Sequence, residues 1–113
     1  MKSYTDIEQS KKLLEILPLE SADIVYLASA EGDDGETLYT AEYKSEVIIY
    51  EADDYINCWS LSALLGALPT FTIDSSDDHY YRVHCMKRYT EWYDNPVDAC
   101  YEMILNLHEL KML

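Results

Sequence analysis

The sequence predicts an α+β domain, in which about three helices pack on an antiparallel sheet of five to six short strands. Three observations predict this fold. Amphipathic helical patterns lie near both ends of the chain, β-branched and aromatic runs lie between them, and 113 residues suit one domain over residues 1–113. Apolar residues make up 49% of the chain and charged residues 27%, so a folded core is expected rather than disorder.

The first helix is predicted to begin at a capping box. In Thr5-Asp6-Ile7-Glu8 the Thr5 side chain can accept a hydrogen bond from the Glu8 amide, while the Glu8 side chain reaches back. Pro18 ends the helical pattern after about three turns. The apolar face of this helix is predicted to contain Ile7, Leu13, Leu14 and Leu17.

Three short strands are predicted to follow the first helix. Residues 24–27, 37–43 and 47–50 are rich in β-branched and aromatic side chains, which favour strands. The first two runs are separated by a polar segment that contains Asp34-Gly35, and glycine tolerates positive φ at little cost. A hairpin is therefore expected, with most acidic residues on loops and solvent-facing positions.

Two further helices are predicted. Residues 59–69 are almost entirely apolar and begin with Ser60 as a plausible N-cap, so this helix is expected to be the most buried element. The last helix is expected to start with Asn95 as its cap and Pro96 at its first position, and to run almost to Leu113.

Between these helices the sequence predicts further strands. Residues 70–73 form one short strand, and residues 80–85 and 89–93 form a hairpin through residues 86–88. A small basic cluster in this hairpin is interleaved with aromatic residues, and we expect it to form a mixed contact surface or to pair with the acidic half of the chain. This cluster consists of Arg82, Lys87 and Arg88 beside Tyr80, Tyr81, Tyr89 and Trp92.

The negative charge is concentrated in one stretch of the chain. Fourteen acidic residues and one basic residue, Lys44, lie between Glu20 and Asp78, so this stretch carries −13 of the net charge of −14. Such a field repels phosphate and attracts basic surfaces, which predicts a basic protein partner and disfavours direct binding to nucleic acid or membranes. The predicted interaction surface comprises Glu31, Asp33, Asp34, Glu36, Glu42, Glu46, Glu51, Asp53 and Asp54.

This concentration of charge predicts a salt-dependent stability. Repulsion among the acidic groups destabilises the folded state. Added salt screens this repulsion, and at 0.1 M ionic strength exposed charges more than about 10 Å apart hardly interact. We therefore expect the melting temperature to rise with sodium chloride concentration in a thermal melt followed by circular dichroism. A melting temperature that does not change between low and high salt would contradict this expectation.

No catalytic residue, cofactor or metal ion is predicted. Carboxylates, imidazoles and a thiol lie close together at Asp74, Asp77, Asp78, His79, His84 and Cys85, but their spacing matches no strong metal motif. If residues 80–85 form a strand, His84 and Cys85 point to opposite faces. The odd number of cysteines (Cys58, Cys85 and Cys100) indicates reduced, mostly buried thiols.

A cytoplasmic location is predicted from two features. The segment Met1-Lys2-Ser3-Tyr4-Thr5-Asp6 lacks the basic and then apolar order of a secretion signal. No apolar run approaches the roughly 18–20 residues that a membrane-spanning helix requires.

Three segments carry a family resemblance. YTDIEQSKKLLEILPLESAD at residues 4–23, CWSLSALL at residues 58–65 and DNPVDACYEMIL at residues 94–105 resemble an uncharacterised family of small acidic bacterial proteins. The segments cover roughly half of the chain. The resemblance implies an accessory role in bacteria and their mobile elements, and it carries over no activity, ligand or catalytic residue.

The leading functional hypothesis is a small acidic, non-enzymatic binding or accessory protein that acts through protein–protein contacts. One alternative is a DNA mimic, in which carboxylates imitate the spacing of phosphates and inhibit a nucleic-acid-binding protein. Another alternative is a small enzyme of unidentified activity. A homo-oligomer is also compatible with the sequence, formed through the apolar helix at residues 59–68 or an uncovered sheet edge.

Overall fold

The computed structural model describes residues 1–33, 35–46 and 55–113, with the backbone alone for residues 29–31 and 46. The helices are α1 (Ile7–Leu13), α2 (Leu61–Ala67) and α3 (Pro96–Glu109), with 3-10 turns η1 (Leu19–Ser21) and η2 (Lys44–Glu46). The strands are β1 (Ile24–Glu31), β2 (Thr37–Tyr43), β3 (Tyr55–Cys58), β4 (Phe71–Ser75), β5 (Tyr81–Cys85) and β6 (Arg88–Tyr89).

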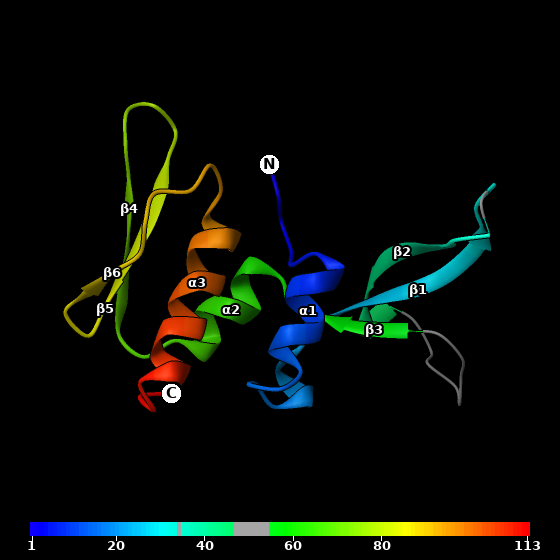
Figure 1. Ribbon diagram of the computed structural model, residues 1–113, viewed down its shortest axis with the longest axis horizontal. Coiled ribbons are helices and arrows are strands. Elements are labelled where there is room, and N and C mark those ends of the chain that lie inside the picture. The colour runs from blue at the N-terminus through cyan, green and yellow to red at the C-terminus, as the bar shows by residue number, and fades with distance from the viewer. Residues whose placement is uncertain (34, 47–54) are drawn as a thin grey trace.

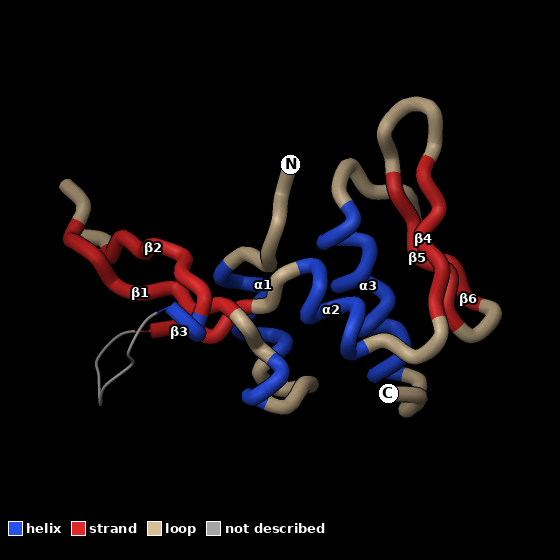
Figure 2. The backbone as a smooth tube through the Cα atoms, turned by 180° about the vertical axis from the view of Figure 1, so that it is seen from behind, coloured by secondary structure: helices blue, strands red, loops and turns tan. Residues whose placement is uncertain are grey.

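The α+β prediction is confirmed, with three α-helices and six strands within the described residues. The strands form two antiparallel sheets rather than one, with the orders β2-β1-β3 and β4-β5-β6. Figures 1 and 2 show these sheets at opposite ends of the molecule, with the helices between them. The radius of gyration is 15.2 Å, whereas a compact chain of this length would have about 13 Å. The protein is therefore elongated.

The main core lies among α1, α2, α3 and the inner face of the β4-β5-β6 sheet. Its largest fully buried side chains include Trp59, Leu13, Leu64 and Met103. The prediction that the helix at residues 59–69 is the most buried element is wrong. Leu64 is the one buried residue of α2, whereas α3 buries seven residues, because α3 packs against β5 on one side and α2 on another.

The first helix begins one residue later than predicted. Asp6, not Thr5, is the N-cap, and its carboxylate accepts a hydrogen bond from the Gln9 amide at 2.8 Å, while the Gln9 side chain accepts from the Asp6 amide at 3.1 Å. Thr5 is buried, and its backbone amide donates to the carbonyl of Trp59. The regular helix ends at Leu13, and turns connect it to Pro18.

The other two predicted helix starts are confirmed. The Ser60 side chain accepts a hydrogen bond from the Ala63 amide, and the Asn95 side chain accepts one from the Asp98 amide. Pro96 occupies the first position of α3. These caps satisfy backbone amides that have no partner within the helix, which is why such short local patterns predict helix starts well.

The first sheet contains the predicted β1–β2 hairpin. Gly35 in the connecting turn has a φ of 79°, as the Asp-Gly step predicted. The predicted strand at residues 47–50 lies outside the described residues. The third strand of this sheet, β3, was not predicted, although it pairs with β1 over four residues. The register of β1 with β2 shifts between Ala28 and Ala30, which marks a bulge in β1.

The second sheet contains the predicted β5–β6 hairpin. Met86 and Lys87 form its turn with φ values of 52° and 67°, so two residues other than glycine or asparagine occupy the left-handed region. The second strand is shorter than predicted and is limited to Arg88–Tyr89. Cys85 is buried and the neighbouring His84 stacks on Tyr89, which confirms that the two side chains point to opposite faces.

Candidate functional site

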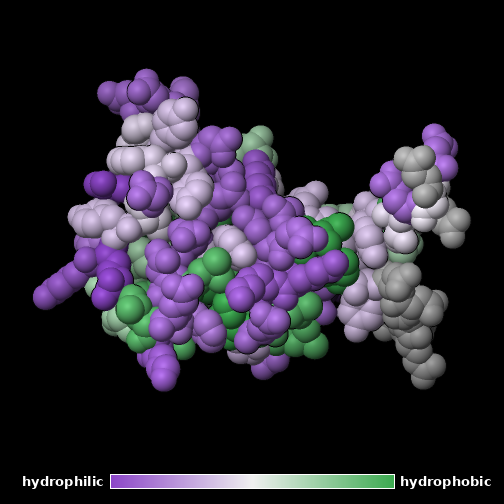
Figure 3. Space-filling view, viewed as in Figure 1, coloured by the Kyte–Doolittle hydropathy of each residue, from purple (hydrophilic) through white to green (hydrophobic). Residues whose placement is uncertain are grey.

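The first sheet projects from the body of the protein and carries the described part of the acidic surface. β1 is buried at Ile24 and Val25, where it enters the core, and exposed by Ala28. β3 follows the same gradient in reverse, since Tyr55 is exposed and Cys58 is buried. Figures 1 and 3 show the far end of the sheet, with its hydrophilic described tip, standing away from the helices. We call residues of β1, β2, β3 and the β1–β2 turn the projecting sheet.

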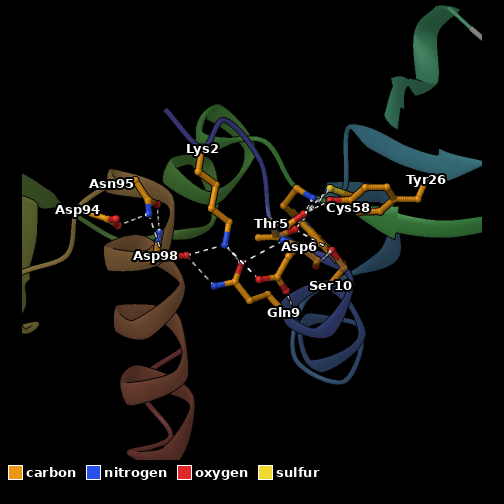
Figure 4. A network of polar contacts seen from close by, with 11 residues as sticks. Lys2, Thr5, Asp6, Gln9, Ser10, Tyr26, Cys58, Asp94, Asn95 and Asp98 are labelled. Atoms are coloured by element: carbon orange, nitrogen blue, oxygen red, sulfur yellow. Dashed lines mark hydrogen bonds and ion pairs between the residues drawn. The ribbon is translucent and has the colours of Figure 1, made fainter. Parts of the chain in front are cut away.

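A network of polar contacts, several of them buried, anchors the projecting sheet to the body (Figure 4). The Tyr26 hydroxyl of β1 donates to the Thr5 carbonyl at 2.6 Å, and the Cys58 thiol donates to the same oxygen at 3.2 Å. The Thr5 hydroxyl hydrogen-bonds with Ser10 of α1 at 2.8 Å and accepts from the Trp59 amide at 3.2 Å. The segment before α1 therefore joins β1, β3 and α1.

A second part of the network joins α1 to α3 through Lys2. Its ammonium group donates to Asp98 and Gln9, both at 2.8 Å, and to Asp6 at 3.2 Å. Burial acts to lower the pKa of Lys2, but hydrogen bonds to Asp98 and Asp6 outweigh burial and raise this pKa. For Asp98, burial acts to raise the pKa, and hydrogen bonds from Lys2, Asn95 and Gln9 outweigh burial and lower it.

The exposed part of the projecting sheet combines apolar and aromatic side chains. Leu38 is 45% exposed, Tyr43 52% and Tyr55 40%. Tyr39 and Tyr26 make an edge-to-face contact with ring centroids 6.5 Å apart. Because side chains alternate across a strand, Tyr39 and Tyr43 lie on one face of β2, and Leu38 and Glu42 lie on the other.

The structure places three of the nine predicted acidic residues in full. Asp33 and Glu36 are exposed at the hairpin tip, and Glu42 is exposed near the other end of β2, where it pairs with Val25. All three therefore belong to the projecting sheet. The side chains of Glu31 and Glu46, and the whole of Asp34, Glu51, Asp53 and Asp54, lie outside what the structure describes.

The three cysteines are free and buried, as predicted. Burial raises the pKa of Cys100 to about 12 and also raises the pKa values of Cys58 and Cys85. A raised thiol pKa lowers the fraction of thiolate at neutral pH, and the thiolate is the nucleophile and metal ligand. Among the residues described, no three His, Cys, Asp or Glu side chains are grouped so that they could hold a metal ion.

In the predicted basic and aromatic cluster of the second sheet, Arg82 pairs with neighbouring side chains. Arg82 donates through Nε to Asp74 at 2.9 Å, and its guanidinium lies 4.3 Å from the ring centroid of Tyr89 and 4.7 Å from that of Trp92. The Asp74–Arg82 pair lies directly opposite in the β4–β5 register. The described contacts of Arg82 are therefore with its own sheet and with the segment that follows β6.

The feature that sequence reasoning missed is the position of β2 at an edge. Within the described residues β2 pairs with β1 alone, because β3 takes the other side of β1. The order of strands is a tertiary property, because strand pairing joins residues far apart in the chain.

No family model, curated protein or solved structure matches this chain. The resemblance to a family of small acidic bacterial proteins therefore stays a prediction. None of the helices in the described parts of the chain is both long and apolar enough to cross a lipid bilayer.

Proposed function

We propose that the protein is a small acidic binding or accessory protein that acts through protein contacts made by the projecting sheet. The observation that carries this proposal is the combination of exposed acidic side chains with exposed Leu38, Tyr43 and Tyr55 on one projecting element. Tyrosine is enriched in protein interfaces, where its ring buries area and its hydroxyl stays hydrogen-bonded. The partner is a protein with a basic surface.

The charge of the sheet supports this choice of partner. Asp33, Glu36 and Glu42 are all exposed on this sheet and its turn. Complementary charge speeds the encounter of two proteins and suppresses wrong partners, while the apolar contacts supply much of the affinity. The aromatic side chains and the acids therefore have separate roles in binding.

A charge-neutralised variant tests the proposal. Tagged wild-type protein and the triple variant D33N/E36Q/E42Q are used to capture partners from the native host, with washes at low and high salt. We expect the wild type to retain a basic protein at low salt and the triple variant to retain about tenfold less of it. Each exposed charge at the periphery of an interface contributes up to roughly 1 kcal/mol to the free energy of binding.

The matched control is D77N/D78N/E91Q. It changes the net charge by the same amount with three exposed acids of the second sheet and its flanking turns. The control should capture the partner as well as the wild type does. Equal loss in both triple variants would show that only total charge matters and would overturn the assignment to the projecting sheet. A partner that binds nucleic acid and is displaced from DNA by the wild type would support the narrower DNA-mimic hypothesis.

A further inference from the structure

The outer edge of β2 has the properties of a site for strand addition. β2 is seven residues long, and among the described strands it pairs with β1 alone. We propose that this edge binds an extended, basic segment of a partner protein, which adds a fourth strand to the projecting sheet. This inference rests on the proposed function and deepens it by naming the chemistry of the partner and the backbone groups that bind it.

The hydrogen bonds of the hairpin identify the backbone groups that face outward. The Lys44 amide donates to the Asp23 carbonyl at 3.0 Å, so this opposed pair is hydrogen-bonded. In an antiparallel ladder, hydrogen-bonded pairs alternate with pairs that are not hydrogen-bonded. By this alternation Glu42 and Thr40 bond inward to β1, and the amides and carbonyls of Tyr39, Ala41 and Tyr43 point away from it.

β2 lacks several of the features that usually protect an edge strand. Proteins block exposed edges with proline, lysine, bulges or very short strands. The sequence Thr37-Leu38-Tyr39-Thr40-Ala41-Glu42-Tyr43 contains neither proline nor lysine, and the bulge in this hairpin belongs to β1. Seven residues give an edge of about 23 Å, which is long enough for a peptide strand.

The two faces of β2 select the side chains of the added strand. On one face Glu42 is exposed, and an opposed Lys or Arg would pair with its carboxylate. On the other face Tyr43 is 52% exposed, and its ring offers a cation–π contact. Basic side chains are therefore favoured on either face of the added strand. A second copy of this chain is disfavoured because each copy has a net charge of −14.

Amide hydrogen exchange of the wild-type protein, followed by NMR, tests the proposal directly. The probe is the blocked heptapeptide Lys-Val-Lys-Val-Lys-Val-Lys, and its matched control replaces each lysine with glutamate. We expect the amides of Tyr39, Ala41 and Tyr43 to exchange rapidly in the free protein and to become protected when the lysine peptide is added. The amides of Thr40 and Glu42 should be protected throughout.

A proline variant adds a binding measurement. Ala41→Pro removes one outward-facing amide and leaves the inward ladder intact, a position at which edge strands tolerate proline. We expect this variant to bind the lysine peptide with about tenfold lower affinity, because it loses one intermolecular hydrogen bond and its ring clashes with the added strand. Thr40→Pro is the contrasting variant, because it removes an inward-facing amide and should unfold the hairpin.

Several outcomes would overturn strand addition. Slow exchange at Tyr39, Ala41 and Tyr43 in the free protein would show that these amides are already paired, and protection that depends on protein concentration would indicate self-association. Equal protection by both peptides would exclude selection by charge. If Ala41→Pro keeps the cellular partner while D33N/E36Q/E42Q loses it, the proposed function stands and strand addition fails; if both variants keep the partner, both fail.

Discussion

Replacing Trp59 with alanine is expected to lower the free energy of unfolding by about 3–5 kcal/mol. Trp59 is fully buried in the core, between the end of β3 and the start of α2. Its indole Nε1 donates to the Ser21 hydroxyl at 2.9 Å. The substitution removes this bond and leaves a cavity that the surrounding helices can fill only in part.

Urea unfolding followed by circular dichroism measures this loss, and the chain offers a matched control. Trp92 is 43% exposed and stacks on Arg82, so Trp92→Ala should cost about 1 kcal/mol or less. Similar losses in the two variants would contradict the placement of Trp59 in the core. Each variant keeps one tryptophan, so fluorescence also reports whether the remaining indole is buried or exposed.

The same variant bears on function because of the position of Trp59. Its backbone amide and carbonyl both bond to Thr5, the residue that also accepts a hydrogen bond from Tyr26. Loss of the indole should loosen this junction between the projecting sheet and the helices. Binding experiments with any variant of the sheet therefore need a stability measurement beside them.

Asp98→Asn is expected to destabilise the protein by about 2 kcal/mol at neutral pH, because hydrogen bonds to a charged group contribute more than neutral ones. Asp98 accepts from Lys2 and Gln9 through one oxygen and from Asn95 through the other. The side chain is 25% exposed, so solvent screens part of the interaction with Lys2. Asparagine keeps the volume and removes the charge.

The difference in stability between wild type and Asp98→Asn depends on pH at both extremes. The pKa of Asp98 is lowered in the folded state, so its contribution is present above its ordinary value of 3.8 and is lost as the pH falls through the folded pKa. The pKa of Lys2 is raised, so its contribution is present below its ordinary value of 10.5 and is lost as the pH rises through the folded pKa.

Urea unfolding of both proteins at about pH 3, pH 7 and pH 11 checks this dependence. The difference should be largest at neutral pH and should shrink at both extremes. Other titrating groups, including Tyr93 and Tyr101, are common to both proteins and cancel in the comparison. A difference that stays constant from acid to alkaline pH would show that the charge of Asp98 contributes nothing. The control Asp94→Asn, at an exposed neighbouring carboxylate, should change stability by less.

Local signals predicted most elements of this fold. Ser60, Asn95 and Pro96 mark helix starts because an N-cap and a first-turn proline act through the adjacent turn alone. Gly35 marks the first hairpin for the same reason, since the turn itself requires a positive φ. The α+β class follows from these elements and the patterns between them.

Competition between neighbouring signals explains the displaced helix start. Thr5 and Asp6 are both good N-caps, and sequence alone gives no strong preference between them. The tertiary structure decides, because Tyr4 forms a bridge with Ser60 and draws Thr5 into contact with Trp59. Asp6 is then the first residue free to cap α1. The burial of α3 is likewise decided by the elements that pack on it.

The sequence by itself determined that this protein is an acidic α+β chain whose charge lies mainly between residues 20 and 78. Composition and local conformational preference do not depend on contacts between residues far apart in the chain. Only the tertiary structure decided that the described strands form two sheets, that β2 lies at an edge among them and that Asp33, Glu36 and Glu42 share a projecting element. Strand pairing joins residues far apart in the chain, so its free energy depends on contacts that no local pattern encodes.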